Sequence, residues 1–153
     1  MEIDQLQLLI KQKAKRFHRK YTPTSEQVRR NRILKNSGHD IKNIRRGNYH
    51  IFFQYFLMNY AKEFNLIGIK EYKVKNGRID VMWQLPNGEN FIAFEIDTSN
   101  RVKSIKKLLD VEAEHRIWIC SAYIVKFEKF KVFGEVTANE IRNGNRVIKC
   151  IYI

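Results

Sequence analysis

The chain has 153 residues, a formal net charge of +13, and 44% hydrophobic and 12% aromatic residues. This composition is typical of a globular domain, and the few glycines and prolines exclude a fibrous or low-complexity chain. No apolar run approaches the roughly 20 residues that span a bilayer, and the chain starts with acids where a signal peptide carries basic residues. We therefore expect a cytoplasmic protein that does not bind membranes.

The two cysteines, Cys120 and Cys150, lie far apart and form no CxxC pair. This spacing indicates neither a disulfide framework nor a zinc site, so we expect both to be core thiols.

Positive charge is concentrated at the front of the chain, where residues 1–46 hold 13 lysines and arginines against 4 acids. A segment of this density attracts polyanions, either nucleic acid or an anionic membrane surface. A helix that lies on a membrane needs a wide, strongly apolar face opposite its polar face, and the basic segment lacks one. Nucleic acid is therefore favoured over a membrane. A solvated basic surface without a partner is the alternative.

Two helices are predicted in this basic segment. Apolar residues recur at helical spacing over residues 3–21, and Thr24 with Gln27 forms a capping box that starts a second helix, ending near residues 37–38. We expect both helices to contact the DNA backbone. The candidate contact residues are Lys11, Lys13, Lys15, Arg16, Arg19, Lys20, Arg29, Arg30 and Arg32.

The pattern changes after Arg46. An aromatic-rich helix over residues 47–65 has Phe52, Phe56, Tyr60 and Phe64 every four residues, flanked by Phe53, Leu57 and Ala61, so one broad face should be buried. Turn signals then separate strands at residues 67–74, 78–85 and 90–98, which we expect to form an antiparallel meander. The meander is followed by a helix over 100–115 and a central strand over 116–125. After these we expect a further strand or short helix and a final strand over 146–153.

These elements predict an α/β fold with a mixed central sheet flanked by helices. Residues 1–46 would form a basic helical extension, and residues 47–153 the core domain. We find no internal repeat.

Three acids fall inside the predicted meander. Side chains alternate along a strand, so Glu95 and Asp97 share a face, and an antiparallel neighbour can bring Asp80 close to Glu95. Like charges on a half-buried face repel one another unless a cation joins them, and carboxylates suit Mg²⁺. Salt bridges to nearby lysines and arginines, without any chemistry, are the alternative.

The order of helix, three strands, helix and strand, with "RID" in the second strand and "FEID" closing the third, resembles the PD-(D/E)XK, or restriction-endonuclease-like, nuclease superfamily. The resemblance covers roughly residues 47–121. It implies that Asp80 and Glu95 bind Mg²⁺ or Mn²⁺ together with the backbone carbonyl of Ile96. Asp97 stands where the family usually has lysine, and Ile79 stands where many members have proline.

The resemblance also implies helper residues for the reaction. In some members a lysine from the following helix takes the missing position, and Lys103, Lys106 and Lys107 are the candidates, with Lys103 nearest the strand end. A polar residue of the first helix often assists, which His50 or Gln54 could do. A solvated face is the alternative for the lysines, and a polar helix start is the alternative for His50.

The function implied is a metal-dependent DNA endonuclease, and a homodimer would fit a family whose members often pair to cut both strands. The alternative is a DNA-binding protein that keeps the nuclease-like fold and has lost catalysis.

Overall fold

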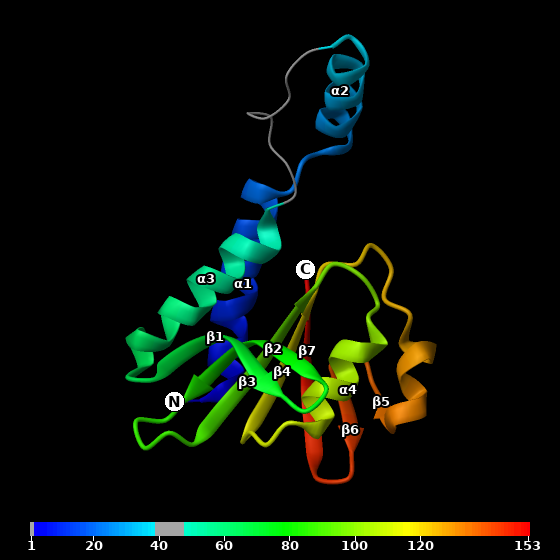
Figure 1. The fold of residues 1–153 in the computed structure, drawn as a ribbon. Helices are drawn as coiled ribbons and strands as arrows, with labels where there is room; N and C mark the ends of the chain where they lie inside the picture. The colour runs from blue at the N-terminus through cyan, green and yellow to red at the C-terminus, as the bar shows by residue number, and fades with distance from the viewer. Residues whose placement is uncertain (1, 39–47) are drawn as a thin grey trace.

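The computed structural model describes residues 2–38 and 48–153 (Figure 1). The helical elements are the α-helices α1 (Ile3–Tyr21), α2 (Ser25–Asn36), α3 (Tyr49–Tyr60) and α4 (Val102–Asp110), and the 3₁₀ segments η1 (Ala61–Phe64) and η2 (Phe127–Phe133). The strands are β1 (Ile67–Val74), β2 (Gly77–Gln84), β3 (Asn90–Asp97), β4 (His115–Cys120), β5 (Glu135–Val136), β6 (Glu140–Asn143) and β7 (Arg146–Tyr152).

The strands form one mixed sheet in the order β1-β2-β3-β4-β7-β6-β5. The predicted meander is confirmed, because β1, β2 and β3 pair antiparallel. The predicted central strand is confirmed as well, since β4 runs parallel to both β3 and β7. The fold is therefore α/β, with a mixed sheet flanked by helices.

Helices cover both faces of the sheet, and each face has its own core. On one face, α1 and α3 lie side by side and pack on Trp83, Phe94 and Ile119 (Figure 1). On the other face, α4 and η2 pack on Met82 and Trp118. Buried apolar side chains on both faces of β2, β3 and β4 explain why these strands form the rigid centre of the molecule.

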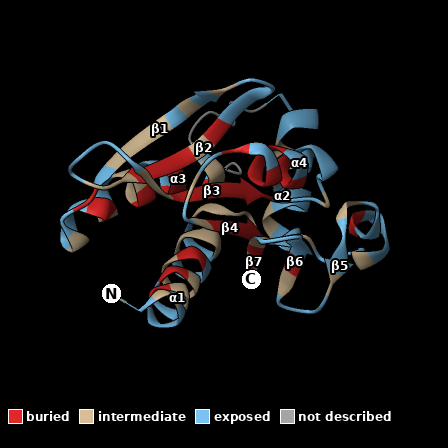
Figure 2. Cartoon of the chain, turned by 90° about the horizontal axis from the view of Figure 1, so that it is seen from below, coloured by how far each residue is buried: buried red, intermediate tan, exposed pale blue. Residues whose placement is uncertain are grey.

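The two basic helices differ in how they pack. α1 buries Leu6, Ile10 and Ala14 in the core shared with α3 and the sheet, and Figure 2 shows this buried stripe on a helix whose other residues are partly or fully exposed. α2 has the predicted capping box between Thr24 and Gln27 but buries no residue, and it stands away from the sheet (Figure 1). Thus α1 is part of the globular core. The predicted boundary at residue 46 falls within residues 39–47, outside the described part of the chain.

The buried face of α3 is centred on Tyr49, Phe53, Leu57 and Ala61. Phe52, which the four-residue repeat placed on that face, is 42% exposed at its edge. α3 also lies very close to β1, because a Cβ on Gly68 would come within 1.8 Å of the Met58 carbonyl oxygen. This close packing holds α3 against the sheet near β2.

Two elements are shorter than predicted. α4 ends at Asp110, where buried Arg116 donates hydrogen bonds to the carbonyl oxygens of Leu108 (2.7 Å) and Val111 (2.7 Å) and so caps the helix. β4 ends at Cys120, and the apolar residues that follow leave the sheet, with Tyr123 fully exposed. Apolar composition alone therefore overestimated the length of this strand.

The cysteines are free and buried, as the sequence predicted. Within residues 2–38 and 48–153, no helix combines the length and the apolar character needed to cross a membrane.

Candidate active site

The ladder between β2 and β3 stops in the middle of both strands. Its last pair is Val81 with Phe94, although the same register would place Asp80 opposite Glu95. The other edge of β2 is irregular at the same point, because Glu71 of β1 has a φ of 58° and does not pair with Asp80. The two strands separate here and leave an opening that we call the fork, formed by residues 78–80 of β2 and 95–97 of β3.

The acids of the fork replace the missing ladder bonds. The Asp80 carboxylate accepts a hydrogen bond from the Ile96 amide (2.8 Å), and the Glu95 carboxylate accepts one from the Asp80 amide (3.4 Å). Each acid thus satisfies a backbone donor of the opposite strand, which would otherwise be left without a partner in a buried position. The acids are therefore held in place by the sheet itself.

Side chains from helices on both faces complete the fork. Gln54 of α3 is buried and donates to the Asp80 carbonyl oxygen (2.9 Å). Lys107 of α4 donates to the Arg78 carbonyl oxygen (2.8 Å), and its ammonium lies 2.5 Å from Glu95 Oε1. His50 Nε2 of α3 lies 3.3 Å from Asp80 Oδ2. Side chains from α3 and α4, which cover opposite faces of the sheet, therefore both contact the fork.

Exposure differs across the fork. The side chains of Glu95 and Lys107 are 2% and 9% exposed, whereas those of Asp80 and His50 are 18% and 41% exposed. Solvent therefore reaches Asp80 and His50 more readily than Glu95 and Lys107.

The two central acids titrate in opposite directions. Burial, together with the hydrogen bond and the charge of Asp80, raises the pKa of Glu95 to about 9, although Lys107 opposes the rise. Hydrogen bonds to His50, Glu95 and the Ile96 amide lower the pKa of Asp80, against the effect of its burial. The hydrogen bond to Asp80 raises the pKa of His50. Without a cation between them, the two carboxyls therefore resist ionising together, and Glu95 is the one whose protonated form is favoured.

Asp97 is anchored differently from the other two acids. It is buried, its Oδ2 accepts a hydrogen bond from the Trp118 indole (2.8 Å), and its carbonyl oxygen accepts one from the Ser121 amide (2.9 Å). Burial raises the pKa of Asp97, while Ser104 and Trp118 oppose that rise through hydrogen bonds. These contacts tie the end of β3 to β4 and α4.

A pocket of about 270 Å³ opens at the fork. The three predicted acids line it, together with His50, the polar candidate from α3. Its full lining is His50, Asp80, Glu95, Ile96, Asp97, Thr98, Ser99, Arg101 and Lys107. Among the three candidate lysines, Lys107 lines the pocket, whereas Lys103 and Lys106 are exposed on α4. Gln54 supports the backbone below the pocket and does not line it.

The residues of the fork fit a hard divalent cation in their chemistry. Asp80 and Glu95 are neighbouring carboxyls, and the charge of Asp80 contributes to the raised pKa of Glu95, which is the situation that a bound cation relieves. The Ile96 amide points into the fork, and because the amide and carbonyl of one strand residue face the same edge, the Ile96 carbonyl faces it too. In the described part of the chain, no three His, Cys, Asp or Glu side chains gather in a ready-made metal cluster. A cation at the fork would have the carboxylates of Asp80 and Glu95 and the Ile96 carbonyl as ligands, completed by water.

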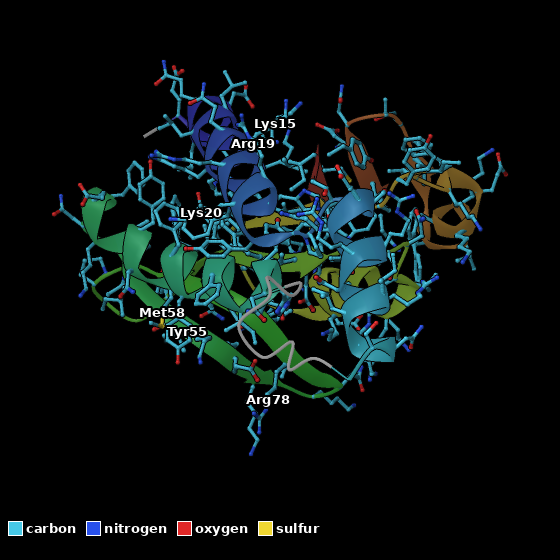
Figure 3. All side chains as sticks on the ribbon, turned by 90° about the horizontal axis from the view of Figure 1, so that it is seen from above. Lys15, Arg19, Lys20, Tyr55, Met58 and Arg78 are labelled. Atoms are coloured by element: carbon cyan, nitrogen blue, oxygen red, sulfur yellow. The ribbon has the colours of Figure 1, made fainter. Side chains whose placement is uncertain are left out.

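The predicted DNA-contact residues lie on α1 and α2. Seven of the nine are exposed, and Lys11 and Lys13 are half-buried beside the core. Figure 3 shows that α1 carries them on more than one side, with Lys20 between α1 and α3 and with Lys15 and Arg19 on the side away from α3.

Arg101 was missed by the sequence analysis. It precedes α4, lines the pocket and favours the charged form of Asp97. A basic residue directly after the acidic strand end was the available signal.

Comparisons with protein-family models, curated proteins and solved structures gave no significant match.

Proposed function

We propose that this protein is a Mg²⁺- or Mn²⁺-dependent DNA endonuclease whose active site is the fork between β2 and β3. The observation that carries the proposal is the approach of Asp80 and Glu95 where the ladder opens, with His50 of α3 and Lys107 of α4 beside them. If the fork had only a structural role, it would need no more than hydrogen-bond partners for its unpaired backbone groups. The buried, hydrogen-bonded pair of acids instead supplies a place for one more positive charge.

Asp80, Glu95 and the Ile96 carbonyl would hold the cation. When bound, it would lower the pKa of a coordinated water and neutralise charge on the scissile phosphate. His50, whose side chain is 41% exposed beside Asp80, would be accessible to bound DNA and can accept or donate a proton there.

Lys107 takes the role that the resemblance assigns to the lysine absent at position 97. Its ammonium already lies 2.5 Å from a Glu95 oxygen, so it can orient a water beside that carboxylate and stabilise negative charge as the bond breaks. Burial keeps it in this position, since the side chain is 9% exposed. Arg101, which directly precedes α4 and also lines the pocket, supplies a second positive charge for the phosphate.

The basic residues of α1 and α2 would grip the phosphate backbone. Such contacts fix the position of DNA without reading its sequence, and they make affinity fall steeply with salt. Within the described residues α2 buries none of its side chains, and Arg29, Arg30 and Arg32 are exposed for this role.

Cleavage of supercoiled plasmid in Mg²⁺ or Mn²⁺ tests the proposal. Wild type should nick or linearise the plasmid, and Asp80→Asn and Glu95→Gln should each lower the rate by at least about 10³-fold while still binding DNA. Asp110→Asn, an exposed acid at the end of α4, serves as the matched control and should cut normally.

Plasmid, branched and single-stranded DNA should all be offered, because the fork does not define the substrate structure. If wild type were as inert as Glu95→Gln on every substrate and metal while binding DNA, the protein would be a DNA-binding protein with a nuclease-like fold.

A further inference from the structure

A second pocket, of about 240 Å³, lies in the groove between α1 and α3. Its lining combines aromatic rings with positive charges, and we call it the aromatic groove: Lys13, Arg16, Phe17, Lys20, Tyr21 and Phe56. Pockets for drug-sized ligands measure about 300–1,000 Å³, so the aromatic groove suits a single ring system. No acidic side chain lines it.

The rings of the aromatic groove are arranged as a stacking surface. The Phe17 and Phe56 ring centroids are 4.9 Å apart, and those of Tyr21 and Phe52 are 4.5 Å apart. Phe17, Tyr21 and Phe56 are half-buried, and the neighbouring Phe52 is 42% exposed. These rings pack against the core below, and each keeps part of its surface open to solvent.

The cations of the aromatic groove lie beside these rings. Lys13 Nζ is 6.0 Å from the centre of the Phe56 ring, and Lys20 Nζ is 5.3 Å from that of Tyr21. Lys13, Arg16 and Lys20 follow one stripe of α1, three or four residues apart, and Figure 3 shows Lys20 between the two helices. Positive charges that border partly exposed aromatic rings match a nucleotide, which has a flat base and a flanking phosphate.

The aromatic groove also connects to the fork through the backbone. The Tyr21 carbonyl oxygen accepts a hydrogen bond from the Asn48 amide (3.2 Å), and Asn48 precedes α3 two residues before His50. The end of the groove at Tyr21 is therefore tied to the end of α3 that carries a residue of the fork.

We propose that the aromatic groove binds an unpaired nucleobase of the DNA substrate, stacked on its rings with the flanking phosphates held by Lys13, Arg16 and Lys20. This inference rests on the proposed function and specifies its substrate: DNA with a single-stranded or unpaired segment beside the scissile bond. Bases inside a duplex are stacked on one another and cannot enter the groove, so fully paired DNA binds through its phosphates alone.

Fluorescence anisotropy in EDTA tests this inference without requiring cleavage. The probes are a duplex with a short single-stranded end, the same duplex with abasic sites in place of the unpaired bases, and the blunt duplex. The abasic probe keeps the phosphates and lacks the bases. Wild type should bind the first probe at least about fivefold more tightly than the abasic one.

Two single substitutions test stacking, and two double substitutions test charge. Tyr21→Leu and Phe56→Leu keep apolar packing but remove the ring faces, so each should reduce the preference for bases at least about threefold. Lys13→Ala/Lys20→Ala and Lys15→Ala/Arg19→Ala each remove two positive charges from α1, one pair inside the groove and the other on the opposite side. Both pairs should weaken blunt-duplex binding similarly, and the groove pair should weaken the single-stranded-end probe more.

Thermal melts by circular dichroism show which variants fold, and the wild-type comparison of base and abasic probes stands without any variant. Equal wild-type affinity for these two probes would overturn the inference, as would equal losses for the two lysine and arginine pairs. Binding to phosphatidylserine vesicles that depends on the groove pair, without a preference for bases, would assign the groove to a membrane surface instead. A failure of cleavage with the base preference intact would count against the proposed function alone.

Discussion

The two halves of β3 differ although they belong to one straight strand. Its first half, around Ile92 and Phe94, pairs with β2 and β4 and buries apolar side chains. Its second half, Glu95–Asp97, still pairs with β4 but has lost β2, and two of its three side chains are acids. The acids of β3 thus occur where the backbone edge that faces β2 is no longer paired. The first half stabilises the fold. In the second half, the Ile96 amide has no backbone partner in β2 and instead donates a hydrogen bond to the Asp80 carboxylate.

The largest effect that would test this difference is expected at Lys107. Lys107→Met keeps the apolar stem but removes the ammonium beside Glu95, so DNA cleavage should fall about 10²- to 10³-fold. Lys103→Met, on the same helix and exposed, should change the rate less than about twofold. Single-turnover cleavage measures both. Equal losses in the two variants would mean that α4 contributes only general positive charge.

A second test concerns Gln54, which supports the backbone of the fork from the α3 side. Gln54→Ala leaves the Asp80 carbonyl without its side-chain donor and should lower the free energy of unfolding by about 1–3 kcal/mol. Urea denaturation measures this change. Asn59→Ala on the exposed side of α3 is the matched control, and a similar loss there would show that the fork has no special need for a donor.

The pH dependence of stability offers a third test. Folded Glu95 holds its proton up to about pH 9, whereas an ordinary glutamate loses it near 4.5. The folded state therefore binds more protons between these values, and the free energy of unfolding in EDTA should fall as the pH rises through this window. His50, with its raised pKa, adds to the fall above its ordinary value of 6.5. The lowered pKa of Asp80 acts only below about 3.8, outside the window.

Melting temperatures at several pH values in EDTA, with ionic strength held constant, measure this slope. Glu95→Gln cannot titrate, so its slope should be shallower than that of wild type. Parallel curves for the two proteins would contradict a proton held on Glu95.

The smallest effect is expected in the paired half of β3. Ile92→Val removes one buried methyl group and should lower the free energy of unfolding by about 0.5–1.5 kcal/mol, with cleavage unchanged. Urea denaturation and plasmid cleavage check the two parts. Slower cleavage by the folded variant would show that the two halves of the strand are coupled.

Much of the fold followed from periodicity and turn residues. Strand alternation predicted that Glu95 and Asp97 share a side of β3, and the meander predicted that Asp80 approaches Glu95. α1 matched its predicted limits because its apolar stripe is regular. These features depend on local spacing, which a sequence displays directly.

The opening of the fork could not be predicted, because it depends on how β1, β2 and β3 twist relative to one another. Glu71 adopts a left-handed conformation opposite Asp80, and glutamate gives no signal for it. The sequence favoured Lys103, whereas the structure places Lys107 at the fork, and the reason is similar. They are one turn apart on the same side of α4, and which turn lies over the fork depends on the loop at residues 98–101 and the tilt of the helix.

The central claim is that the fork binds a divalent cation, and calorimetric titration of the metal-free protein with Mg²⁺ and Mn²⁺ tests it most directly. Wild type should bind the cation, Asp80→Asn and Glu95→Gln should lose at least about tenfold in affinity, and Asp110→Asn should bind as wild type does. If wild type and the two fork variants gave the same titration, Asp80 and Glu95 would hold the sheet together and nothing more.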